Sequence, residues 1–253
     1  MRSSRCCALA FVAALAWAVV LSHHGSAQDA GAAAPADAAA AAEALELART
    51  AFEAADTALN LAYDRAREVL PAVDFERLRL DQRAWLEGRD PEAATYARIQ
   101  HWGGSEDVSE TPDYFDYRTA STEMRLEYLL GLIAYHEGPG RRGWDGFWVD
   151  GRGGHLAVRE LDDGRLRFQL SVVRSPAAHT GWLEGIADRN GDLARFETTY
   201  EVGVDTEPVW LFLVRDGPYL RVHTANAQYF AGVRAYFDGD YVRLRDLEPF
   251  DID

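Results

Sequence analysis

The spacing of the apolar residues changes abruptly near residue 138, and this change limits the possible fold more than any other feature. Before that point, apolar residues recur every three or four positions, which is typical of one face of an α-helix. After it, they alternate with polar residues, as in Leu166–Val172, which is typical of β-strands. Gly138-Pro139-Gly140 lies between the two patterns as a hinge. The sequence therefore predicts an α+β protein with helices first and strands second.

Three helices are expected before residue 138, and we expect them to form a three-helix bundle over residues 43–137. Pro71 marks the end of the first helix, and Asp74 is a candidate N-cap of the second. A loop that contains Gly103-Gly104 separates the second helix from the third. The expected helices are Glu43–Leu70, Asp74–Gly88 and Ser121–His136.

About eight antiparallel strands are expected between residues 144 and 246. Asn190-Gly191 stands between two alternating runs and is a strong signal for a β-hairpin. Eight short strands with no helix between them predict a small barrel or sandwich, and a barrel leaves no exposed sheet edge. We expect an antiparallel β-barrel domain over residues 140–253. The other turn signals are Asp162-Asp163-Gly164, Asp216-Gly217-Pro218 and Asp238-Gly239.

The first 27 residues are typical of a secretory signal peptide. Arg2 and Arg5 precede an apolar run, Ala8–Leu21, that is shorter than the roughly 20 residues of a membrane span. The small residues Gly25-Ser26-Ala27 fit a cleavage site before Gln28. An uncleaved membrane anchor is the alternative interpretation. Residues 28–42 are rich in Ala, Asp, Pro and Gly and are expected to form a tether, with Ala38–Ala42 as a candidate extension of the helix that follows.

The charge balance and the cysteine count exclude several classes of protein. The chain has 41 acidic residues and 26 basic ones, all arginine, for a net charge of −15. Loss of residues 1–27 would remove two Arg and no acidic residue, so the net charge would become −17. This negative charge argues against a nucleic-acid binder. Cys6 and Cys7 are the only cysteines and precede the apolar run, so a disulfide framework and a lipidated cysteine are not expected. The sequence predicts an acidic protein exported to the periplasm or the extracellular space, with no membrane span after cleavage.

No residue pattern indicates catalysis, a metal or a cofactor. The chain has no Gly-x-Ser-x-Gly motif, and the histidines after residue 27 lack the spacing of a helical metal pair. The segment 188–192 fits a hairpin turn better than a calcium loop, because its glycine comes too early and no closing Glu follows. We therefore expect neither enzyme activity nor a cofactor.

Gln82, Trp85 and Arg89 lie at positions i, i+3 and i+7 and therefore share one helical face. A tryptophan in such a position belongs to a core. A buried amide or guanidinium beside it needs a polar partner, for which Asn60, Tyr63 or a carboxylate are candidates. A structural role is the main interpretation of this face.

The same residues carry a resemblance to a known family. The patterns Leu59-Asn60-x-x-Tyr63 and Leu78-x-x-x-Gln82-x-x-Trp85-x-x-x-Arg89-Asp90 resemble the N-terminal domain of the LprI family, exported bacterial proteins named after a lysozyme-inhibitor lipoprotein. The stretch Thr122–Leu129, with Arg125, is similar to the closing helix of that family. The resemblance implies a helical fold and gives six candidate binding positions, for which a structural role stays the main interpretation: Asn60, Tyr63, Gln82, Trp85, Arg89 and Arg125.

One departure from the family pattern concerns the loop before the third helix. Family members usually carry one cysteine after the Arg-Asp pair and another before the closing helix, and this chain has neither. We expect packing to hold the loop instead, through Trp102, Tyr114, Phe115 and Tyr117.

Three functions remain open at this point, and for the third, an uncharacterised hydrolase, the sequence has no supporting residue pattern. The first is an acidic binding protein that recognises a cationic secreted protein, of which lysozyme is the case that the family resemblance implies. Aromatic residues near Ala227–Ala231 are candidates for a surface facing such a partner. The alternative is an envelope-associated structural module whose barrel binds a small apolar ligand. The sequence does not indicate the oligomeric state.

Overall fold

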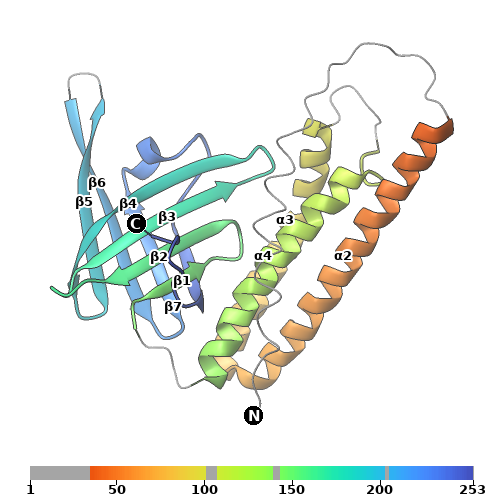
Figure 1. Ribbon diagram of the computed structural model, residues 1–253. Coiled ribbons are helices and arrows are strands. Elements are labelled where there is room, and N and C mark those ends of the chain that lie inside the picture. The colour runs from red at the N-terminus through yellow and green to blue at the C-terminus, as the bar shows by residue number, and fades with distance from the viewer. Residues whose placement is uncertain (1–34, 101–106, 139–142, 203–204, 253) are drawn as a thin grey trace. The chain divides into compact units, whose positions relative to one another are not determined.

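The computed structural model describes residues 35–100, 107–138, 143–202 and 205–252, and it contains three helices followed by eight strands (Figure 1). Residues Leu45–Asp253 form one compact unit by their contacts. The predicted signal peptide lies outside the described residues. Within the described ranges, no helix combines the length and the hydropathy needed to cross a membrane.

All three helices are longer than the sequence predicted. Helix α2 begins eight residues earlier than expected, so part of the expected tether is helical, because this stretch is mostly alanine, the strongest helix former. Helix α3 continues past Gly88 and through Pro91, and its buried face continues with Ala93 and Ala97. Helix α4 begins at a proline, a favoured first residue, behind the N-cap Thr111. The observed helices are α2 Pro35–Val69, α3 Ala72–Gln100 and α4 Pro112–Glu137.

The eight strands form a closed antiparallel barrel, which confirms the predicted fold class. Each strand pairs with the next one in the chain, and β8 pairs with β1 to close the ring. The predicted hairpin at residue 190 is present, with Gly191 in its turn at a φ of 63°. The strands are β1 Gly146–Val149, β2 Gly154–Glu160, β3 Leu166–Arg174, β4 His179–Asn190, β5 Leu193–Val202, β6 Asp205–Asp216, β7 Tyr219–Ala225 and β8 Gly239–Arg245.

Side chains fill the interior of the barrel. Leu166, Phe168, Leu170 and Val172 of β3 are all buried, as their alternation predicted. They belong to one apolar cluster with residues from the other strands and with Trp144. This packing counts against the alternative function, because it leaves the barrel interior occupied by the protein itself.

A second apolar cluster joins the helices to the outside of the barrel. Leu59 of α2, Trp85 of α3 and Leu132 of α4 are in the same cluster as Val242 of β8. Gly131 allows the close approach, since a Cβ at that position would lie 2.8 Å from Cγ2 of Val242. Helices and barrel therefore share a core, and the boundary between two domains near residue 138 stays a prediction.

Candidate binding pocket

A pocket of about 660 Å³ lies between helices α3 and α4 and one end of the barrel, and we call it the junction pocket. Helix α3, the turn between β1 and β2, and the start of β8 provide its charged walls. Three tyrosines, Tyr128, Tyr219 and Tyr236, also line it. The charged residues of the lining are Arg77, Asp81, Asp150, Arg152, Asp238 and Asp240.

Asp81 is held on the α3 wall by two arginines. Its Oδ2 lies 2.6 Å from Nη1 of Arg125, and its Oδ1 accepts a hydrogen bond of 2.7 Å from Nη2 of Arg152. Burial alone would raise the pKa of Asp81, but the two guanidinium groups outweigh burial and lower the pKa below its ordinary value. Asp81 is therefore ionised at neutral pH, and the two guanidinium groups balance its charge.

Arg125 is completely buried and connects the family motif to the pocket. Its Nε donates a hydrogen bond of 2.7 Å to Oε1 of Gln82. Its guanidinium carbon lies 4.9 Å from the ring centre of Tyr128, which lines the pocket. Two of the predicted motif positions thus stand directly behind Asp81 and fix its orientation.

Asp150 fixes the turn between β1 and β2. Its Oδ1 accepts hydrogen bonds from the backbone N–H groups of Arg152 (2.8 Å) and Gly154 (2.7 Å). Its Oδ2 lies 2.6 Å from Nη1 of the buried Arg174. The guanidinium of Arg174 in turn lies 4.4 Å from the ring centre of Tyr236, so Asp150, Arg174 and Tyr236 form one chain of contacts at the pocket.

On the wall near β8, Arg77 of α3 forms an ion pair with Asp240. The guanidinium carbon of Arg77 also lies 3.9 Å from the ring centre of Tyr219. Burial raises the pKa of Tyr219 to about 12, so ionisation of its hydroxyl is even less favourable than in an ordinary tyrosine, and the hydroxyl can donate a hydrogen bond.

Asp238 is the acid of the pocket that is best placed for a partner. Its side chain is exposed, and it accepts hydrogen bonds from the backbone N–H (2.9 Å) and Oγ1 (2.6 Å) of Thr224. Within the described part of the chain, no arginine forms an ion pair with it. Tyr236, half of whose surface is exposed, stands two residues away. A cation could contact this carboxylate without displacing another cation.

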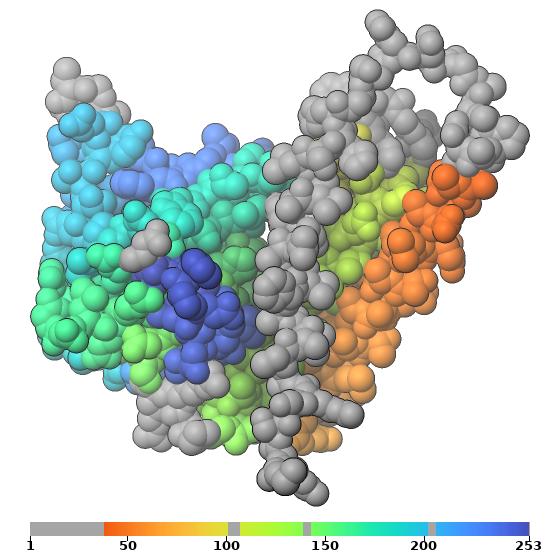
Figure 2. All heavy atoms as spheres, viewed as in Figure 1, coloured from red at the N-terminus to blue at the C-terminus, as the bar shows by residue number. Residues whose placement is uncertain are grey.

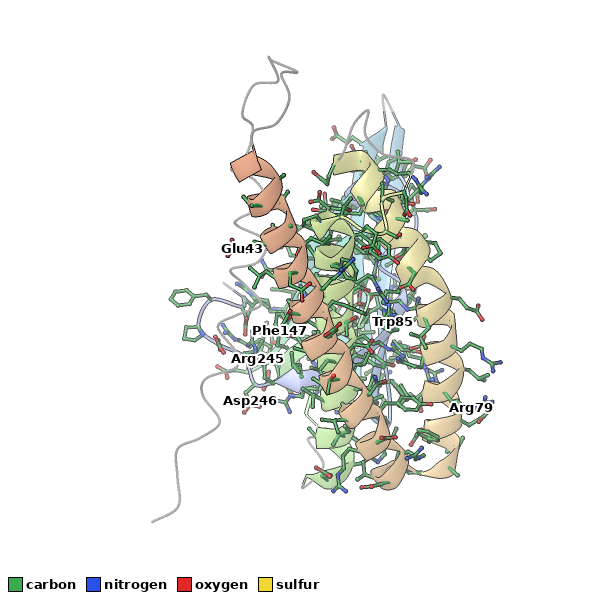
Figure 3. All side chains as sticks on the ribbon, turned by 90° about the vertical axis from the view of Figure 1, so that its right-hand side faces the viewer. Glu43, Arg79, Trp85, Phe147, Arg245 and Asp246 are labelled. Carbon is green, nitrogen blue, oxygen red and sulfur yellow. The ribbon has the colours of Figure 1, made fainter. Side chains whose placement is uncertain are left out.

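The other motif positions lie deeper in the helical bundle. Trp85 is 5% exposed and points from α3 into the bundle, whereas Arg79 of the same helix points away from it (Figure 3). Arg89 is buried, and its Nη1 donates to Oδ1 of Asp56 (3.0 Å), whose Oδ2 accepts from Nδ2 of Asn60 (3.1 Å). The carboxylate of Asp56 therefore links the motif positions Asn60 and Arg89.

Tyr63 does not join this network, and its ring packs against Phe75 with ring centres 5.5 Å apart. The aromatic residues expected to hold the loop lie in the first turns of α4 instead. Phe115 packs against Phe52 at 6.1 Å, and Tyr117 packs against Tyr96 at 5.3 Å. Trp102 lies outside the described residues.

The sequence alone did not indicate the junction pocket. The one local signal for the pocket is that Asp81 stands next to the motif residue Gln82. Asp238 belongs to a predicted turn, Asp150 had no predicted role, and the approach of the helices to the barrel brings both near Asp81. In the described ranges, no group of three or more His, Cys, Asp or Glu side chains is arranged to hold a metal ion.

Comparison with known families supports the motif. Residues 32–129 match the family model described as "Lysozyme inhibitor LprI". The helical region of this chain is LprI-like. The matched LprI-like region contains all six motif positions and Asp81, and it ends inside α4, before the barrel. Neither curated proteins nor solved structures gave a significant match.

Proposed function

We propose that this protein is an exported, acidic binding protein that acts as a lysozyme-inhibitor-like module and recognises a cationic secreted protein. The match of residues 32–129 to a family of lysozyme inhibitors is the observation that carries this proposal. The proposed action is stoichiometric binding, and it requires no chemical step by the protein itself.

The charge of the chain supports a cationic partner. The net charge is −15, and residues 43–137 contain 20 acids and 10 arginines. Such an excess attracts a basic protein over distances of about a Debye length, roughly 10 Å at 0.1 M salt, and raises the association rate. Long-range attraction does not select one partner, so a specific contact is also needed.

The junction pocket is the candidate for that contact. Asp238 presents a carboxylate that is hydrogen-bonded only to Thr224 among the described residues, beside the partly exposed ring of Tyr236. A lysine or arginine side chain of a partner would gain an ion pair with Asp238 and contact with the ring. Asp81 is already paired with Arg125 and Arg152, so Asp238 is the carboxylate of the pocket that a cationic side chain would contact.

Lysis of bacterial cell walls by hen-type lysozyme tests the proposal. The protein purified from residue 28 onward should slow the loss of turbidity at micromolar concentration, and added salt should weaken the effect. Full-speed lysis at low salt, with the protein in excess over the enzyme, would contradict the proposal.

A matched pair of variants locates the contact. Asp238→Asn removes one charge from the pocket, whereas Asp192→Asn removes one from the turn between β4 and β5, which is not part of the pocket lining. If the pocket binds the partner, Asp238→Asn should weaken inhibition about tenfold, as for the loss of one charge-assisted contact, and Asp192→Asn should change it little. Equal effects would assign inhibition to net charge alone.

A further inference from the structure

The hairpin of β5 and β6 extends beyond the closed part of the barrel. The two strands pair along their whole length, from Leu193↔Val214 to Val202↔Asp205. In contrast, β5 pairs with β4 only up to Arg195, and β6 pairs with β7 only from Trp210. Residues 196–202 and 205–209 therefore form a two-stranded arm, visible at the upper left of the ribbon and space-filling views (Figures 1 and 2).

The free backbone groups of β5 can be assigned from one hydrogen bond. The N–H of Arg215 donates to the carbonyl of Asp192 (2.9 Å), so the even-numbered residues of β5 face β6. Alternation along the strand then directs the N–H and C=O groups of Glu197, Thr199 and Glu201 to the other side. Among the described residues, no strand pairs with that side beyond Arg195.

The opposite edge of the arm is less able to accept a strand. Pro208 of β6 has no N–H to donate, and its carbonyl accepts a hydrogen bond of 2.9 Å from Nδ2 of Asn226. Proline is a common device that prevents pairing at a sheet edge. Residues 196–202 of β5 contain no proline, so the β5 edge is the open one.

The arm is also strongly acidic. Between Arg195 and Arg215 the sequence has four acidic residues and no basic one. Glu197 and Glu201 are exposed and belong to the same edge, and of these two Glu197 is paired with Arg195. A second copy of the chain would bring like charges together on this edge, which is unfavourable, whereas an extended basic segment would be complementary.

We propose that the open edge of β5, from Phe196 to Glu201, binds an extended, cationic segment of a partner protein by strand addition. Backbone hydrogen bonds to Glu197, Thr199 and Glu201 would hold the segment, and basic side chains on it would meet the two glutamates. The arm is anchored by the ring of Tyr200, which stacks on Tyr229 at 4.7 Å, and a third strand would add backbone pairing on the side that β4 leaves open. This inference rests on the cationic partner of the proposed function and deepens it.

A pair of peptides tests strand addition separately from charge. A labelled seven-residue peptide of alternating Arg and Val should bind the protein from residue 28 onward, measured by fluorescence anisotropy. The control peptide has the same sequence with N-methyl groups on all of its amides, so it keeps the charge and cannot donate backbone hydrogen bonds from either edge. We expect the control to bind about tenfold more weakly, as for the loss of a few net hydrogen bonds. Equal binding of both peptides, or none by the first, would overturn the proposal.

Two variants at one position test the edge itself. Thr199→Pro removes the N–H that faces away from β6, and Thr199→Val keeps that N–H and removes only the hydroxyl. Thr199→Pro should weaken binding of the first peptide about tenfold, and Thr199→Val should leave it nearly unchanged. Circular dichroism shows whether each variant is folded.

Glu201→Gln provides a second test that leaves the backbone intact. Glu201→Gln should bind the peptide more weakly and with a smaller dependence on salt. Unchanged binding by Thr199→Pro and Glu201→Gln would overturn the proposal.

The same samples separate this proposal from the proposed function. If the peptide binds and depends on Thr199 while the wild-type protein does not slow lysozyme, the edge proposal stands and the lysozyme proposal fails. If lysozyme is inhibited equally by wild type and Thr199→Pro and neither binds the peptide, only the edge proposal fails. If the wild-type protein sediments as a dimer and the Thr199→Pro variant as a monomer, the edge binds a second copy of the chain. That result would overturn the proposal that the edge binds a cationic segment.

Discussion

The side-chain carbonyl of Gln82 accepts a hydrogen bond of 2.7 Å from Nε of Arg125, and this bond joins α3 to α4 in the interior of the bundle. Both side chains are buried. The other end of the same guanidinium lies against Asp81 at the junction pocket. A polar pair that is part of the family pattern thus has two consequences: it holds two helices together and fixes a carboxylate at a candidate binding site.

Removal of Gln82 should be costly because it leaves a buried donor without an acceptor. We expect Gln82→Leu to reduce the free energy of unfolding by about 1–3 kcal/mol, measured by urea denaturation. Gln100→Leu makes the same chemical change at an exposed position of α3 and should alter stability by less than about 0.5 kcal/mol. Equal effects of the two substitutions would show that the Gln82–Arg125 bond contributes little.

Trp85 should contribute more to stability through its packing. We expect Trp85→Ala to lower the free energy of unfolding by about 3–5 kcal/mol, as is usual for a buried aromatic side chain. The neighbouring Leu86 is 46% exposed, and Leu86→Ala should have a small effect. A loss below about 1 kcal/mol for Trp85→Ala would place this face at a surface and favour a direct binding role for it.

Asp81 should make stability depend on acid pH. Its pKa in the folded protein is lower than the ordinary value of 3.8, so its ionised form stabilises the fold. This contribution is fully present above the unfolded pKa and is lost as the pH falls through the lower folded pKa. Asp81→Asn should therefore destabilise the protein at pH 7, and the difference from wild type should shrink in acid. If the stability difference between Asp81→Asn and wild type does not change with pH, the ion-pair account is contradicted. Asp162→Asn, in an exposed turn, is the control.

Glu127 of α4 should show the opposite sign. Burial and the nearby Glu123 raise the pKa of Glu127 above its ordinary value of 4.5, so its ionised form opposes folding. Glu127→Gln should stabilise the protein at pH 7, and the gain should disappear as the pH falls below the folded pKa and wild-type Glu127 takes up a proton. Thermal unfolding at several pH values measures this, with Glu87→Gln at an exposed position of α3 as the control. Destabilisation at neutral pH would refute the account of Glu127.

The number of helices and of strands could be predicted because each depends on local spacing, whereas closure of the barrel depends on the distant pairing of β1 with β8. Helix ends could not be predicted equally well. Residues 35–42 have no large apolar residue, yet alanine favours a helix there without a core contact. The second helix was expected to end at Gly88, but the buried stripe of α3 continues with Ala93 and Ala97, so tertiary packing outweighs the hydrogen bond lost at Pro91.

The junction pocket and the open β5 edge could not be predicted for a different reason. Asp81, Asp150 and Asp238 are far apart in the chain, and only the packing of α3 and α4 against the barrel brings them together. The alternation of β5 is the same whether one or both of its edges are paired, so the sequence does not reveal where β4 and β5 separate.

Direct binding to lysozyme tests the central claim most simply. Isothermal titration of hen-type lysozyme into the protein from residue 28 onward should give a saturable complex with a dissociation constant in the micromolar range or below at low salt. Binding should weaken as salt rises and should be reduced by Asp238→Asn more than by Asp192→Asn. Absence of heat and of co-sedimentation at low salt, with both proteins at tens of micromolar, would contradict the account.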